Sequence, residues 1–181
     1  DTTWAMMCDA NERAHSRERG DDPDKLPKIY ARVINMALEG KPADMVVTMH
    51  SCRGNFRSTW IAEGGYEPVA EVMFNDTNID GYFLEYDSER AGSFEPLRFF
   101  PKGKKQLVLG LVTSKSGRLE LRDDIKRRID EASKYVALDQ LCLSPQCGFA
   151  STEEGNVLAE DEQWAKLNMI VELAEEVWGR N

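Results

Sequence analysis

The feature that most constrains the fold of this chain is an alternation of short apolar runs with longer helical stretches. The apolar runs predict strands at 45–49, 81–84, 106–112 and 141–144. Short apolar segments of this kind, bounded by turn residues, are typical of buried strands in a parallel sheet. Spacing and end signals predict helices over 25–38, 59–74, 119–136 and 160–178. Residues 1–9 read as the end of an earlier strand and its loop.

Strands that alternate with helices predict parallel βαβ units with right-handed crossovers. Four such strands could form a small open sheet, or they could be half of a (β/α)8 barrel, which usually needs about 250 residues. Polar side chains favour the barrel: His50 and Cys52 close the first run, Glu85 closes the second and Cys147 follows the fourth. Functional side chains of such barrels lie at the carboxyl ends of the strands, so we predict an α/β fold of this class.

Composition narrows the class of protein. With 181 residues, 41% of them apolar, the chain can form one domain with a real core. A net charge of −9 without a basic stripe argues against nucleic-acid and anionic-membrane surfaces. The apolar runs are too short for a membrane span, and no basic and apolar leader opens the sequence. Because the chain opens on Asp1 rather than on Met, we expect a portion of a longer protein.

The four cysteines, Cys8, Cys52, Cys142 and Cys147, could form two disulfides. A chain with a large core and no secretory signal does not need such staples, so we expect reduced thiols and a cytoplasmic protein. Cys142 lies inside a predicted strand and is expected to be a small core residue. For Cys8 the sequence indicates no partner.

Potential metal ligands gather at the predicted strand ends. Residues two apart in an extended segment point the same way, so His50 and Cys52 can face one ion. Cys147 lies between Pro145, which ends a strand, and Gly148, which allows a close turn. Alone, each of these residues is more simply a packing residue, but together they form a set that suits tetrahedral zinc.

Glu85 completes this set, because a carboxylate in an apolar, aromatic strand is costly to bury unless it is paired or binds a metal. The alternative for Glu85 is a salt bridge to Arg53, Arg57 or Arg90. Asp87 has the same strand parity and is a competing ligand.

Four stretches carry a resemblance to a known family. They are Met49-His50-Ser51-Cys52-Arg53-Gly54-Asn55, Phe83-Leu84-Glu85-Tyr86-Asp87, Leu109-Gly110-Leu111-Val112-Thr113-Ser114-Lys115 and Leu143-Ser144-Pro145-Gln146-Cys147-Gly148-Phe149. The chain resembles the carboxyl-terminal part of the cobalamin-independent methionine synthases, over nearly its whole length, and is most similar to the short single-barrel members. The resemblance implies that residues 1–181 are the later half of a catalytic (β/α)8 barrel. It also implies zinc held by His50, Cys52, Glu85 and Cys147.

The resemblance further implies an activity, the transfer of a methyl group from 5-methyltetrahydrofolate (polyglutamate) to the thiol of homocysteine, giving methionine. Zinc would keep the bound substrate sulfur as a thiolate, and Glu85 is the ligand expected to yield to it, because thiolates are better zinc partners. The family's aspartate for the homocysteine amino group would fall immediately before Asp1. Asp1 and Ser114 are our candidate substrate-binding residues in this chain.

The chain departs from the family pattern in two places. Where the full-length synthases carry a histidine proton donor, this chain has Thr113-Ser114-Lys115, and the acidic folate contact expected near Ala5–Met7 is absent. Lys115 and Asp87 are the remaining candidates for positioning the methyl donor or supplying a proton.

Two other functions stay open at this stage. One is methyl transfer to a thiol from a corrinoid or another donor, and the other is a zinc-stabilised barrel fragment without catalysis. Because four strands cannot close a barrel, we also expect a homodimer or pairing with the missing half of the barrel.

Overall fold

The structure, a computed structural model, describes residues 4–179. Its elements, with η for a 3-10 helix, are η1 (Met6–Cys8), α1 (Ala10–Glu18), α2 (Leu26–Ala37), β1 (Thr48–Ser51), α3 (Ala70–Asn75), β2 (Gly81–Glu85), η2 (Glu89–Ala91), η3 (Glu95–Phe99), β3 (Gln106–Val112), α4 (Arg122–Ser133), η4 (Leu138–Gln140), β4 (Leu141–Pro145) and α5 (Glu160–Trp178). Among these described helices, none is both long and apolar enough to cross a membrane.

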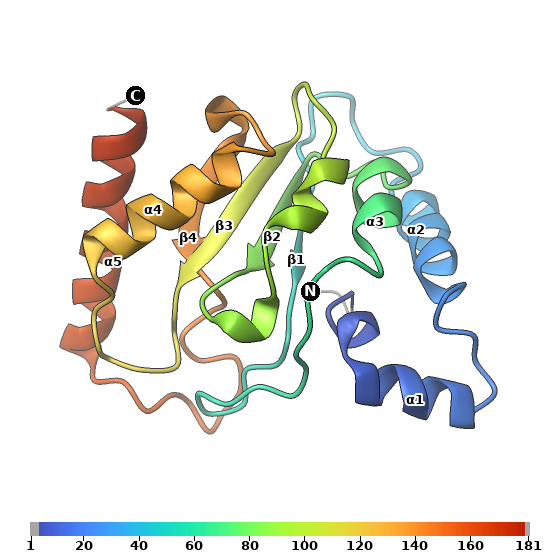
Figure 1. The fold of residues 1–181 in the computed structure, drawn as a ribbon, viewed down its shortest axis with the longest axis horizontal. Helices are drawn as coiled ribbons and strands as arrows, with labels where there is room; N and C mark the ends of the chain where they lie inside the picture. The colour runs from blue at the N-terminus through green and yellow to red at the C-terminus, as the bar shows by residue number, and fades with distance from the viewer. Residues whose placement is uncertain (1–3, 180–181) are drawn as a thin grey trace.

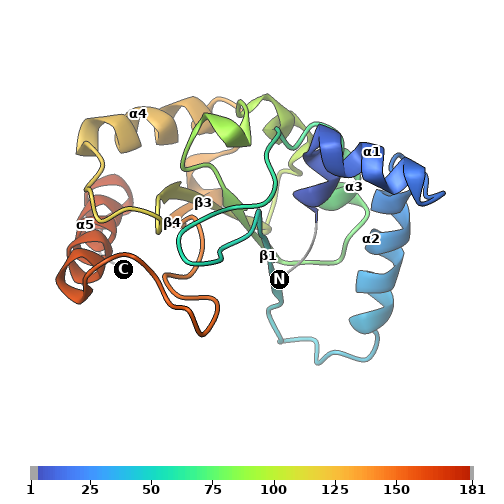
Figure 2. The ribbon, with the colours of Figure 1, turned by 90° about the horizontal axis from the view of Figure 1, so that it is seen from below.

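The four strands form one parallel sheet in the order β1-β2-β3-β4. Winding in one direction without a reversal is how consecutive strands of a (β/α)8 barrel pair, whereas doubly wound open sheets reverse their order. The loops that follow the strands all lie at the lower edge of Figure 1. Seen from that edge, the helices form an arc along one side of the sheet (Figure 2).

One face of the sheet packs in the hydrophobic core, and the other carries the row of residues that includes His50. Tyr82, Leu84, Leu107 and Leu109 are fully or almost fully buried and belong to the hydrophobic core. The alternate residues form a row across the sheet, because register pairs His50 with Phe83, Phe83 with Val108 and Val108 with Cys142. Cys142, expected in the core, is only half-buried in this row, with its Sγ 3.5 Å from Gln106 Oε1.

Most predicted elements are confirmed. The bounds of β3 and α5 are as predicted, β2 and β4 are each one residue longer, and α2 is one residue shorter at each end. Helix α4 is narrower than the predicted 119–136.

The predicted strand at 45–49 is displaced. Met45 and Val46 are exposed, and β1 begins at Thr48 because pairing with β2 starts at Gly81. His50 therefore lies inside the strand rather than after it.

The predicted helix at 59–74 is wrong except for its end, which is α3. The segment before α3 is a loop in which Gly54 and Gly64 have positive φ. Buried Arg53 fixes this loop, since its guanidinium donates to Gly64 O at 2.7 Å. Side-chain bonds to the loop backbone thus replace the helical ladder.

Of the strand and loop predicted for residues 1–9, the structure describes residues 4–9, where the chain forms a turn and the 3-10 helix η1 rather than a strand. Helix α1 was not predicted, because its sequence has little apolar periodicity. Asp9 starts it by accepting the backbone N–H groups of Asn11 and Glu12.

Candidate metal centre

The structure brings the four predicted metal ligands together at the carboxyl ends of the strands. One side-chain atom each from His50, Cys52, Glu85 and Cys147 lies within 4.8 Å of the others. The two sulfur atoms are 3.8 Å apart, and His50 Nε2 is 3.6 Å from Glu85 Oε1. The ligands come from β1, β2 and the residues that follow β1 and β4, segments that are distant in the sequence.

These separations fit a tetrahedral zinc ion. Zn–S bonds near 2.3 Å place two sulfur ligands about 3.8 Å apart, and Zn–N and Zn–O bonds near 2.1 Å place a nitrogen and an oxygen about 3.4 Å apart. The observed 3.8 and 3.6 Å lie close to both values. The donor set of nitrogen, oxygen and two sulfurs is also one that zinc accepts.

The backbone of β2 orients the imidazole of His50. Its Nδ1 is 3.2 Å from the carbonyl oxygen of Phe83, the residue it faces in the register. Because a carbonyl can only accept, Nδ1 donates to it, so Nε2 is the nitrogen that faces the cluster and can bind a metal once it has lost its proton. Burial lowers the pKa of His50, but the Cys52 sulfur and the Glu85 carboxylate outweigh it and raise this pKa to about 9.

A glycine in the middle of β3 allows Cys147 to reach the other ligands. The pairing of β3 with β4 shifts between Gly110 and Val112, and Gln146 N–H then donates to Val112 O at 2.8 Å. The end of β4 thereby crosses over Gly110, where an added Cβ would lie 2.8 Å from Gln146 Cα. A residue with a side chain at position 110 would obstruct this path.

Glu85 is fully buried, and its carboxylate accepts two hydrogen bonds besides its contact with His50. Its Oε1 accepts the backbone N–H of Arg53 at 3.2 Å, and its Oε2 accepts from Arg90 at 3.1 Å. Burial raises the pKa of Glu85, but His50, Arg90 and the Arg53 N–H outweigh it and hold this pKa below its ordinary value. The predicted alternative of a salt bridge to Arg90 is therefore present together with the metal-ligand geometry.

The two thiols share a proton unequally. The hydrogen bond with Cys52 lowers the pKa of Cys147 to about 7, although burial opposes it. The same bond, together with burial, raises the pKa of Cys52 to about 12. Cys147 is thus the sulfur that first becomes a thiolate.

Asp87 is not part of the four-ligand cluster. Its carboxylate lies 2.8 Å from Arg90 Nη2. With the amide of Gln146 oriented to satisfy all its neighbours, its nitrogen donates to Asp87 and Thr113, both at 2.6 Å, and its oxygen accepts from Arg90 at 2.7 Å. Burial raises the pKa of Asp87.

The other predicted site residues have different surroundings. Ser114 is fully buried, and Lys115 donates to Gly54 O, Asn55 Oδ1 and Thr59 O at 3.1, 3.0 and 2.8 Å. These bonds use every donor of the ammonium group and join the loop after β3 to the loop after β1. Asp1 lies outside the described residues.

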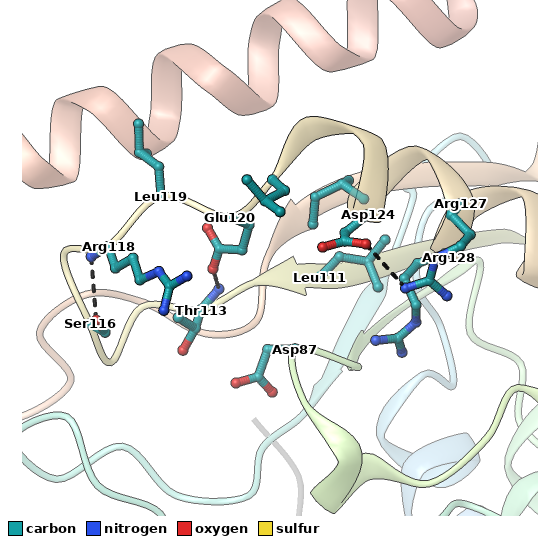
Figure 3. A pocket seen from close by; sticks show the side chains of 12 residues that line it. Asp87, Leu111, Thr113, Ser116, Arg118, Leu119, Glu120, Asp124, Arg127 and Arg128 are labelled. Carbon is teal, nitrogen blue, oxygen red and sulfur yellow. Dashed lines mark hydrogen bonds and ion pairs between the residues drawn. The ribbon is translucent and has the colours of Figure 1, made fainter.

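One cavity opens on the ligands, and a second lies beside Asp87. The first, of about 250 Å³, is lined by His50, Phe83, Pro145 and Cys147 among others, and provides an apolar approach to the ligands. The second, of about 380 Å³, lies between the loop after β3 and the start of α4 (Figure 3). Asp87 lines this second cavity.

Sequence reasoning missed the roles of Gly110 and Gln146 in shaping the centre. It considered Arg53 only as a salt-bridge partner of Glu85, whereas the backbone N–H of Arg53 donates to the carboxylate. Gly110 had a usable signal, since a glycine inside an apolar strand often marks a bulge or a close backbone approach. Gln146 is 1% exposed and Arg53 is fully buried, but no local pattern distinguishes them from surface residues.

Comparison with known proteins places the chain in a family. The family profile described as "Cobalamin-independent synthase, Catalytic domain" matches residues 31–176, which is most of the chain. The chain belongs to the cobalamin-independent methionine synthase family. Two uncharacterised proteins of Bacillus subtilis (strain 168), YxjH and YxjG, are 56% and 58% identical to it over 178 residues. Those residues are 98% of this chain but 47% of each relative, so the chain spans about half their length.

Solved structures of the methionine synthase family agree with the fold. The crystal structure of a candidate vitamin-B12-independent methionine synthase from Listeria monocytogenes matches with a TM-score of 0.76 and 46% identity, over 99% of this chain and 47% of that one. A B12-independent methionine synthase from Shewanella sp. W3-18-1, in complex with selenomethionine, matches with a TM-score of 0.67 over 85% of this chain and 44% of that one. At 20% identity the second likeness shows the fold alone. The predicted α/β barrel class is confirmed.

Proposed function

We propose that this chain provides the zinc and thiol half of a methionine synthase active site. The reaction is transfer of a methyl group from 5-methyltetrahydrofolate (polyglutamate) to the thiol of homocysteine. The observation that carries the proposal is the convergence of His50, Cys52, Glu85 and Cys147 within 4.8 Å. Bound zinc would lower the pKa of the substrate thiol and keep it as a nucleophilic thiolate.

The side chains divide the remaining work. Phe83 O fixes the tautomer of His50, and Arg53 and Arg90 orient the Glu85 carboxylate. Two thiolates and one carboxylate carry a charge of −3, which exceeds the +2 of the ion. This excess would keep a bound sulfur electron-rich. We assign the carbon chain of homocysteine to the apolar cavity beside Phe83, which leads to the ligands.

Methyl transfer from the folate requires a proton. The S–CH₃ bond forms as the N–CH₃ bond breaks, the bonding electrons stay on the folate nitrogen, and that nitrogen takes a proton. Asp87 is our candidate for supplying it, since it lines a cavity and shares Arg90 with the ligand Glu85. Because the donors of Lys115 are already used, its contacts favour the positioning role for that residue.

A second candidate is methyl transfer from a corrinoid. Such a donor leaves its bonding electrons on cobalt and needs no proton. The loop after β3 favours this candidate, because its side chains are poorly placed to donate a proton. Ser114 is fully buried, and the ammonium group of Lys115 is already bonded to backbone and amide oxygens.

The remainder of the pocket, including contacts to the amino group of homocysteine, would come from the other half of the barrel. In the described part, β1 and β4 each pair with one strand only, so we propose pairing with that half or with a second copy. Reduced thiols of this kind suit the cytoplasm.

The test uses the protein expressed at the full length of its reading frame. Zinc content is measured first, and methionine formation from homocysteine is then followed with methyltetrahydrofolate or with a methylated corrinoid. One equivalent of zinc and activity with the folate would support the main proposal, and activity with the corrinoid alone would support the second. One equivalent of zinc with no alkylation of homocysteine by either donor would support a zinc-stabilised barrel without catalysis and refute both.

A further inference from the structure

Arg90 carries a buried hydrogen-bond donor that the resting arrangement does not use. Its side chain is 6% exposed, and Nη2 contacts both Glu85 Oε2 and Asp87 Oδ1. Its Nη1, by contrast, is shut off from solvent and has no hydrogen-bond partner among residues 4–179. The ring of Trp60 lies over the guanidinium, with its centroid 5.1 Å from Cζ.

An unused buried donor is costly, and native structures rarely keep one without a reason. Since Nη1 is closed to solvent, an acceptor that already lies beside the guanidinium can reach it with the smallest movement. The carboxylates already bonded to Nη2 are those of Glu85 and Asp87. Asp87 is also held by the amide of Gln146. Glu85 is the one that also belongs to the ligand cluster.

Excess negative charge around the metal would favour release of the Glu85 carboxylate. Under the proposed function, on which this inference rests, an incoming thiolate would raise the anionic charge around a +2 ion from −3 to −4. A carboxylate that leaves the ion restores the earlier balance only if it finds another cation, because an unpaired buried charge is strongly unfavourable.

We infer that Arg90 binds the Glu85 carboxylate after a thiol substrate has taken the place of that carboxylate at the metal. Oε2 stays on Nη2 while Oε1 leaves the ligand cluster for Nη1, giving the two parallel bonds that guanidinium and carboxylate groups prefer. Arg90 is thus a positioning residue that favours exchange of the ligand.

The test measures binding rather than turnover. The full-length protein is loaded with Co²⁺, whose absorption reports the ligand set, and is titrated with homocysteine. Arg90→Met should keep one equivalent of Co²⁺ but weaken homocysteine binding about tenfold or more, the usual worth of a charge-assisted hydrogen bond. Arg90→Lys, which keeps the charge without the fork, should lie between Arg90→Met and the unsubstituted protein. Arg98→Met, which removes an exposed arginine paired with Glu67, is the matched control and should bind as the unsubstituted protein does.

A double-mutant cycle separates this role from a structural one. In the Glu85→Ala background, Arg90→Met should no longer change homocysteine affinity, because there is no carboxylate to receive. An equal loss in both backgrounds, or no loss in either, would overturn the inference while leaving the proposed function intact. Failure of the unsubstituted protein to bind Co²⁺ or homocysteine would overturn both.

Discussion

Gly110→Ala should disable the metal centre without touching a ligand. The new Cβ would lie 2.8 Å from Gln146 Cα, 2.8 Å from Leu84 O and 3.2 Å from Pro145 O. Favourable carbon contacts need about 3.5–4.0 Å, so backbone must shift by roughly 0.5 Å or more. All three neighbours are backbone atoms and cannot rotate away.

Either direction of relief displaces a ligand. Moving Gln146 carries Cys147 with it, and moving Leu84 carries Glu85. Metal sites tolerate errors of only about 0.2 Å in ligand distance. We therefore expect zinc affinity to fall about 10- to 100-fold, comparable to the loss of an outer-shell partner, with a destabilisation of about 1–3 kcal/mol from overpacking.

The assay is competition for zinc between the protein and a chelator, together with thermal unfolding at matched metal concentrations. Gly148→Ala is the control, since its Cβ would lie next to Cys147 but 3.8 Å from the nearest atom, Ser151 Oγ. If Gly110→Ala binds zinc as tightly as Gly148→Ala, the explanation for the path of β4 is refuted.

Three further outcomes are expected. In metal-free protein, iodoacetamide should modify Cys147 before Cys52, at a rate that rises as pH increases through about 7, because the pKa of Cys147 is about 7 and that of Cys52 about 12; peptide mass spectrometry measures the order, and equal rates would contradict it. Arg53→Met should lower the free energy of unfolding by about 3 kcal/mol, since it leaves the Gly64 carbonyl without its buried donor and removes one of the two donors to Tyr66 OH; a denaturant titration in which the midpoint does not move would contradict this. Lys115→Met should leave zinc content unchanged but speed proteolysis of the loop after β1, which loses three bonds; retained protection would show that these bonds do not hold the loop.

The sequence by itself determined the class of fold and the identities of the candidate ligands. Period-two patterns specify which strand residues share a face, so His50 and Cys52 had to point the same way. The long apolar run of β3 and the amphipathic pattern of α5 likewise depend on local spacing, and their bounds agree with the structure. Elements predicted from such local patterns agree with the structure because burial of one face is the main driving force for their formation.

Only the tertiary structure decided how the ligands meet and what surrounds them. The loop at 59–69 is not helical because Arg53 and Lys115 bind its backbone, and such long-range bonds leave no local pattern. Gln146 is buried because β4 crosses over Gly110, a consequence of the packing of two strands. The pairing of Arg90 with Glu85 was one of three alternatives that the sequence left open, and the pairing of Arg90 with Asp87 was not predicted. The tertiary structure determines which charges pair, because the interaction energy depends on their distance in space and not on their separation along the chain.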